Sequence, residues 1–161
     1  EGGRRSGTEN VPGIAGLGMA AELSRNELNS RIRHAAALRD GLWERLQRLN
    51  LNLVRNSPDG NCLPGTLNFS LPGINSRELV RQLDEAGFCV ATGSACSTGK
   101  TTPSHVIKAI GRNDAAASSS IRISLGEGNT EAEIAAFVEV LPRAVEQAWA
   151  VSRASSGREG R

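Results

Sequence analysis

One apolar stripe near the start of the chain constrains its fold more than any other feature. Its members recur at steps of three and four residues: Leu28, Ile32, Ala35, Leu38, Leu42, Leu46 and Leu49. This spacing predicts one long helix, and Pro12 suits a first turn that begins near Val11. A coiled coil is the competing interpretation, but the repeat lasts only about three heptads. We therefore expect this helix to pack on its own domain.

Short strand patterns follow the helix. Residues 66–71 alternate apolar and polar side chains, which is typical of a half-buried strand. Briefer apolar runs predict strands at 51–54 and 88–91. A further strand is predicted at 121–125, where Arg122 points away from the face that carries the isoleucines.

Helix signals separate these strands. Asn75 is a predicted N-cap with Glu78 at the capping-box position, and Gly87 is the predicted end of that helix. The pair at 102–103, Thr then Pro, predicts the start of another helix, which Gly111 closes.

A full capping box, Thr130 with Glu133, opens the last predicted helix. The segment from Val151 onward is polar and rich in Gly and Ser, so it is predicted to be a disordered tail. The predicted order of helices and strands indicates an α+β fold, with a small, mostly antiparallel sheet covered by helices.

Composition narrows the functional classes. The 161 residues suit one domain, and the net charge of +2 indicates neither a nucleic acid nor an acidic partner. No run of apolar residues approaches the length of a membrane span, and no secretion signal is visible. The three cysteines, an odd number without a C-x-x-C pair, predict neither a disulfide framework nor a zinc site. A reducing, cytoplasmic location fits best.

The segment TGSACSTGKTT, residues 92–102, permits two functional interpretations. It resembles a phosphate-binding loop, but Gly93 and Gly99 enclose five residues where that motif has four. None of the predicted strands ends in the acidic residue that would hold Mg²⁺. The alternative is a loop that carries a reactive thiol at its centre.

The thiol of this loop is Cys96. Its small and polar neighbours leave it little to pack against, and exposed thiols are normally avoided because they oxidise. An incidental surface cysteine remains the competing interpretation. Cys89, between two apolar residues, is predicted to be a small buried hydrophobe, and so is Cys62.

Several segments together resemble one known family. They are RRSGTEN, VPGIAGLGMAAEL, LPGTLNFSLPG, GSACSTG, PSHVIKAIG and SSSIRISLG, which occur in that order from Glu1 to about Leu141. They resemble the C-terminal part of the cysteine desulfurases, which are class V aminotransferase-like enzymes that depend on pyridoxal 5'-phosphate. The nitrogen-fixation and iron–sulfur-cluster branch is the most similar, although it often has Ser-Ser where this chain has Ala91 and Thr92.

The resemblance implies a domain organisation. The fold is that of the small C-terminal domain of a fold-type I pyridoxal-phosphate enzyme. Residues 1–10 would form a cofactor-phosphate loop of the large domain, and residues 11–50 a long linking helix. Residues 51–150 would form the small domain with the cysteine loop, and residues 151–161 a disordered tail.

The resemblance also implies roles for individual residues. Cys96 matches the nucleophile, which takes sulfur from L-cysteine as a persulfide and leaves alanine. Arg122 matches the arginine that holds the substrate carboxylate, although from the pattern alone it would more often face solvent. Thr8 matches a threonine that reaches the cofactor phosphate of the neighbouring subunit, which implies a homodimer; otherwise it would cap the following helix. His105 belongs to the family pattern, and we expect it to pack on its helix.

The large-domain part of the family pattern has no counterpart. The family's Schiff-base lysine lies in a Ser-x-His-Lys segment, and neither Lys100 nor Lys108 has that context. The implied partners are therefore L-cysteine, a second copy or a complementing large domain, and a sulfur acceptor or scaffold protein. Two alternatives remain: a non-catalytic sulfur carrier that accepts persulfide on Cys96, and an oligomerisation element in which Cys96 is inert.

Overall fold

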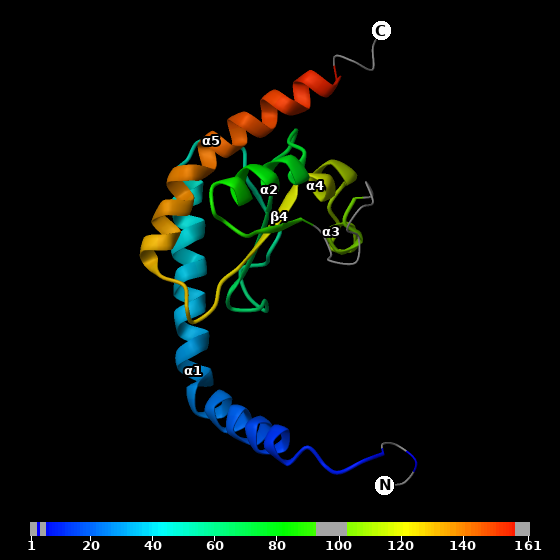
Figure 1. Ribbon diagram of the computed structural model, residues 1–161. Coiled ribbons are helices and arrows are strands. Elements are labelled where there is room, and N and C mark those ends of the chain that lie inside the picture. Colours follow the sequence, from blue (N-terminus) through cyan, green and yellow to red (C-terminus); the bar gives the residue numbers. More distant parts are fainter. Residues whose placement is uncertain (1–2, 4–5, 93–102, 157–161) are drawn as a thin grey trace.

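The computed structural model describes Gly3, residues 6–92 and residues 103–156, with side chains through Arg153. Its helices are α1 (Val11–Gln47), α2 (Ser76–Glu85), α3 (His105–Ala109), α4 (Asp114–Ser118) and α5 (Glu131–Ser156). Its strands are β1 (Val54–Arg55), β2 (Thr66–Ser70), β3 (Ala91–Thr92) and β4 (Ser120–Ser124). Figure 1 shows the helices around one small sheet, which confirms the predicted α+β class.

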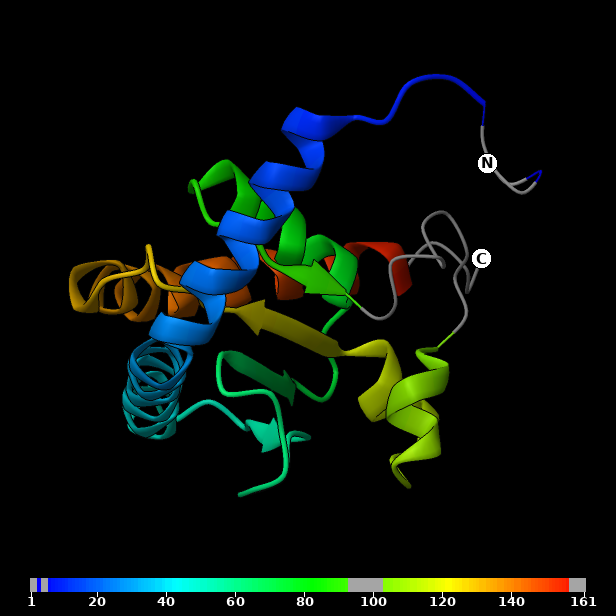
Figure 2. The same cartoon turned by 90° about the horizontal axis from the view of Figure 1, so that it is seen from below.

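The sheet is antiparallel throughout, in the order β1-β2-β4-β3 (Figure 2). Its centre is the pair β2 and β4, in which Leu67 lies opposite Ile123 and Phe69 opposite Ile121. Because side chains alternate along a strand, this register places all four of these residues on one face. The alternation predicted for residues 66–71 and 121–125 is thus confirmed.

The apolar face of the sheet carries the core. Helices α1, α2 and α5 cover it, and α5 packs against both of the others (Figure 1). They contribute a set of buried aliphatic and aromatic side chains: Leu38, Leu42, Leu46, Leu79, Leu83, Ile134, Phe137 and Leu141. Full burial of each such side chain stabilises the fold by about 1.5–3 kcal/mol.

The long helix α1 differs between its two halves. From Ala35 onward its apolar stripe is buried, as predicted for a helix that packs on its own domain. Before that point the stripe is exposed, and Leu28 and Ile32 keep 53% and 40% of their surface. The first half, blue in Figure 1, extends away from the sheet. The prediction of a packed helix is therefore wrong for this half.

Two predicted strands are shorter than expected. β1 begins only at Val54, and β3 is confined to Ala91–Thr92 instead of 88–91. The cause at β3 is the end of α2, where Gly87 has a left-handed backbone with φ +88°. In this helix cap the N–H of Phe88 donates to Leu83 O at 2.8 Å, so it is not available to a strand.

The helices on either side of Gly111 also depart from the prediction. α3 begins at His105 after Ser104, and not at 102–103. Gly111 follows its end with φ +86°, as predicted. The next helix, α4, was not predicted, although Asn113 caps it by accepting the N–H of Ala116 at 2.9 Å.

The predicted caps of α2 and α5 have different outcomes. Asn75 caps α2 through the N–H of Arg77, but Glu78 does not close a box, because its carboxylate accepts from Arg81 and Gln82. At α5 the box is complete. The N–H of Thr130 donates to Glu133 at 2.7 Å, and the N–H of Glu133 donates to the Thr130 hydroxyl at 3.3 Å.

α5 continues through Ser156, so the tail predicted from Val151 onward is wrong for residues 151–156. Two side-chain contacts lie within this last part of the helix. The Ser152 hydroxyl donates to Ala148 O at 2.9 Å, and the Arg153 guanidinium lies 5.3 Å from the Trp149 ring centre. Residues 157–161 lie outside the described part. Over the helices that the structure does describe, none is long and apolar enough to cross a membrane.

Candidate functional site

The second face of the sheet is polar. It carries the strand residues that alternate with the core positions: Thr66, Asn68, Ser70, Ser120, Arg122 and Ser124. Arg122 lies at its centre, since its strand partners are Asn68 on β2 and Ala91 on β3. The orientation predicted for Arg122, away from the isoleucines, is confirmed by this register.

Arg122 is half-buried and lacks a carboxylate partner within the described part of the chain. The other half-buried arginines of that part each contact a carboxylate: Arg31, Arg39, Arg45 and Arg55. A guanidinium presents donors that match both oxygens of a carboxylate, and partial burial strengthens such a pair. Arg122 is therefore the arginine best suited to bind an external carboxylate.

Strand β3, which precedes the predicted nucleophile segment in the sequence, lies beside Arg122. β3 pairs with β4 so that Ala91 lies opposite Arg122 and Thr92 opposite Ile121. Cys96 and the rest of residues 93–102 lie outside the described part, so neither the thiol loop nor the phosphate loop is placed. Cys96 follows Thr92 by four residues in the sequence.

The two other cysteines differ from the prediction of buried hydrophobes. Cys89 is exposed, because Phe88 turns inward to pack edge-on against Phe137, with ring centres 5.4 Å apart. Cys62 is half-buried, and its sulfur lies 3.3 Å from Nη1 of Arg39. Neither cysteine lies on a strand of the sheet.

Thr8 belongs to the segment that precedes α1. Figure 1 shows that this segment leads into the half of α1 that extends away from the sheet. The cap of α1 is Asn10, which accepts the N–H of Gly13 at 3.1 Å, so the alternative role of Thr8 as that cap is wrong. His105 is exposed at the start of α3, contrary to the packing role predicted for it.

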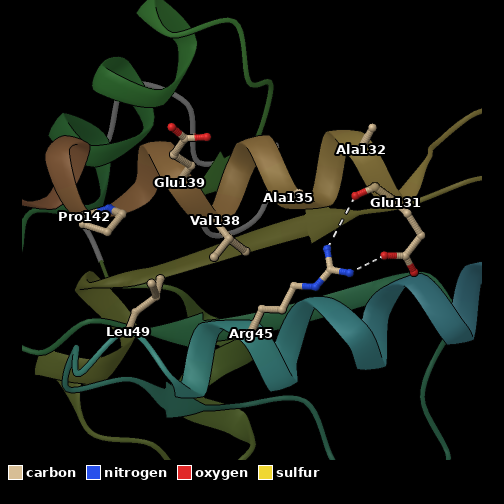
Figure 3. A pocket seen from close by; sticks show the side chains of 8 residues that line it. All are labelled: Arg45, Leu49, Glu131, Ala132, Ala135, Val138, Glu139 and Pro142. Carbon is tan, nitrogen blue, oxygen red and sulfur yellow. Dashed lines mark hydrogen bonds and ion pairs between the residues drawn. The ribbon is translucent and has the colours of Figure 1, made fainter.

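A groove of about 600 Å³ lies between α1 and α5 (Figure 3). Arg45 closes one end of it through an ion pair with Glu131, and Leu49, Val138 and Pro142 line the rest. Both helices belong to the apolar side of the sheet. The groove is therefore separate from Arg122 and from the start of the Cys96 segment.

Comparison with known proteins identifies the family. The aminotransferase class-V family matches residues 2–137, and the chain belongs to it. It is 40% identical, over 152 residues, to a cysteine desulfurase of Nostoc sp.. That alignment covers 94% of this chain but only 38% of the relative, so the chain spans well under half the length of the curated relatives it matches.

Solved structures show the same fold. An X-ray structure of a NifS-like protein from Rickettsia africae has a TM-score of 0.74 at 31% identity, covering 88% of this chain and 36% of that protein. A second NifS-like protein gives 0.75 at 35% identity, covering 89% and 36%. These matches confirm the resemblance to cysteine desulfurases and the relation to fold-type I pyridoxal-phosphate enzymes.

Proposed function

We propose that this chain forms the carboxylate-binding and sulfur-accepting part of a cysteine desulfurase. One observation carries the proposal: Arg122, unpaired within the described residues, lies beside the strand that leads into the Cys96 segment. The similarity to cysteine desulfurases supports the choice of L-cysteine as the substrate. Arg122 binds the substrate carboxylate through two parallel hydrogen bonds.

Cys96 is the proposed sulfur acceptor. In the overall reaction, L-cysteine and the Cys96 thiol give L-alanine and a Cys96 persulfide. The carbon–sulfur bond of the substrate breaks, a sulfur–sulfur bond forms, and a proton is added to the substrate carbon. The sulfur is oxidised while the carbon is reduced, so no external oxidant is needed. The persulfide is then available to an acceptor or scaffold protein, in iron–sulfur cluster assembly or a related pathway.

The described residues do not fit covalent attachment of pyridoxal 5'-phosphate. Attachment needs an uncharged lysine amine. Lys108 is the lysine of the described part, and it pairs with Asp114 at 2.8 Å on the surface of α3. In our proposal a large domain, from another segment or another chain, supplies the attachment. In a homodimer, Thr8 would contact the cofactor phosphate of the neighbouring subunit's site.

A sulfur carrier without activity of its own is the second candidate, and the unsuitable environment of Lys108 favours it. In this case the chain accepts persulfide on Cys96 from another desulfurase. For both candidates we propose a cytoplasmic location, which rests on the odd number of cysteines and on a thiol that must stay reduced.

Release of L-alanine from L-cysteine tests the proposal. The chain is assayed with pyridoxal 5'-phosphate and a reductant, alone and together with the remaining segment of a related desulfurase. We expect alanine only in the mixture, and its loss in Cys96→Ala but not in Cys89→Ala, the matched exposed cysteine. Unchanged alanine release in Cys96→Ala would show that Cys96 is not the nucleophile. If the mixture releases no alanine, but a separate complete desulfurase acting on L-cysteine without reductant places a persulfide on Cys96, the chain is the carrier.

A further inference from the structure

A chain of hydrogen bonds runs from α4 to the strand neighbour of Arg122. The Ser70 hydroxyl donates to the backbone oxygen of Ala116 at 2.8 Å. Nδ2 of Asn56 donates to Ser70 Oγ at 2.7 Å and to Oδ1 of Asn68 at 2.8 Å. The chain therefore ends at Asn68, which lies directly opposite Arg122 in the β2–β4 pairing.

The backbone carbonyl of Ala116 sets the direction of every hydrogen bond in this series. Ala116 O can only accept, so it takes the single hydroxyl proton of Ser70. Ser70 Oγ must then accept, and Asn56 must present its NH₂ group, whose two hydrogens are both used. Asn68 in turn must present its oxygen to Asn56. The NH₂ group of Asn68 is left without an acceptor among the described residues.

Asn56 holds this arrangement rigidly. It is only 7% exposed, and its Oδ1 is buried without a partner. Reversing its amide would place that oxygen against two acceptors, Ser70 Oγ and Asn68 Oδ1, so the unpaired oxygen is the less costly state. The backbone of Asn68 is fixed as well, since its N–H donates to Ser57 Oγ at 2.8 Å.

We propose that Asn68 is a second donor in the carboxylate site of Arg122, with Asn56 and Ser70 as positioning residues. Directly opposed side chains of an antiparallel pair have Cβ atoms about 5 Å apart, close enough to share one ligand. A carboxylate offers about four lone-pair sites, which suffice for a guanidinium and an amide together. Arg122 and Asn68 would offer only donors to the ligand, and the guanidinium is positively charged. The site is therefore expected to prefer an anion to a neutral amide. The inference rests on the proposed function only for the identity of the ligand.

The first test is an NMR titration of the whole chain with sodium acetate, with acetamide as the uncharged probe. We expect acetate to shift the side-chain amide resonances of Asn68 and the Nε–H resonance of Arg122 along one saturation curve. Acetamide at equal concentration leaves both unshifted. Control resonances come from the exposed amide of Asn52.

Variants separate contact from positioning. Asn68→Ala raises the Kd for acetate about tenfold, the value of one hydrogen bond to a charged group. Asn68→Asp raises the Kd further, because it places a negative charge beside the ligand. In Asn56→Asp, residue 56 can no longer donate to Asn68. Acetate binding is therefore weaker although residue 56 does not contact the ligand, and the Asn68 amide resonances shift even without acetate. Asn52→Ala, the matched control, leaves the Kd unchanged.

The outcomes distinguish this inference from the proposed function. If acetate shifts Arg122 while the Asn68 amide stays still, and Asn68→Ala keeps the wild-type Kd, Asn68 is not a donor and only the inference is overturned. If acetate shifts neither residue, the carboxylate role of Arg122 fails, and the inference fails with it. Asn68 is partly exposed whereas Asn56 is buried, so we expect Asn68→Ala to fold. If Asn56→Asp fails to fold, the acetate Kd of Asn68→Ala tests the inference.

Discussion

The same strands form both faces of the sheet, but α1, α2 and α5 cover only the apolar face. Phe69 and Ile121 have no exposed surface there. On the polar face, the hydrogen bonds of Ser70 and Asn56 are largely internal, whereas the donors of Arg122 and Asn68 remain unused within the described residues. The comparison shows that one face provides stability, and we propose that the other provides binding.

Substitution of Phe69 gives the largest expected effect, and it falls on stability. Phe69 is fully buried, with its ring centre 6.3 Å from that of Trp43. Phe69→Ala lowers the free energy of unfolding by about 3–5 kcal/mol, as measured by urea denaturation. A loss below about 1 kcal/mol would show that this face is not the core.

Substitution of Arg122 tests the polar face, and its expected effect is on acetate binding. Arg122→Ala lowers the affinity for acetate on the order of 100-fold, because a charged hydrogen-bond pair is lost. Arg122→Lys keeps the charge but loses the bidentate geometry, so it restores binding only in part. The free energy of unfolding of both variants stays within about 0.5 kcal/mol of the wild type. A large loss of stability together with full binding would reverse the assignment of the two faces.

The capping box of α5 gives an intermediate effect on stability alone. Thr130→Ala removes the acceptor of the Glu133 N–H, and it costs about 1 kcal/mol of unfolding free energy. Thr130→Ser, the matched control, keeps the cap. Acetate binding is unchanged in both variants, since this helix covers the opposite face. Weakened binding in Thr130→Ala would mean that the faces are coupled.

Acid pH gives the smallest expected effect. The hydrogen bond from Arg81 holds the pKa of Glu78 below its ordinary value of 4.5. A carboxyl whose pKa is lower in the folded state stabilises the protein above its unfolded pKa, and this stabilisation is lost as the pH falls through the folded pKa. Urea denaturation from pH 6 downward should therefore show a shallower decline in Glu78→Gln. An identical decline in both proteins would show that the Arg81 pair contributes nothing.

Local patterns predicted the parts of this fold that local chemistry determines. The alternation in β2 and β4, the Asn75 cap and the Thr130 box each depend on residues close in sequence, and each is confirmed. The start of β3 was missed because Phe88 donates to the preceding helix cap. The exposure of Cys89 follows from the same turn.

The candidate site was only partly predictable. Alternation placed Arg122 on the polar face, but its lack of a carboxylate partner depends on which segments the fold brings near it. The chain from Ala116 through Ser70 and Asn56 to Asn68 joins three segments distant in sequence. The available signal was weak: an asparagine at a polar strand position. The exposed first half of α1 was missed because its spacing is the same as that of the buried half.

The transfer of sulfur to Cys96 is the most direct test of the central claim. The chain is mixed with the remaining segment of a related cysteine desulfurase, pyridoxal 5'-phosphate and L-cysteine, and its peptides are analysed by mass spectrometry without reductant. We predict one additional sulfur atom on the Cys96 peptide, absent in Arg122→Ala, and none on the Cys89 peptide. Equal labelling of Cys89 and Cys96, or labelling that does not depend on Arg122, would contradict the account.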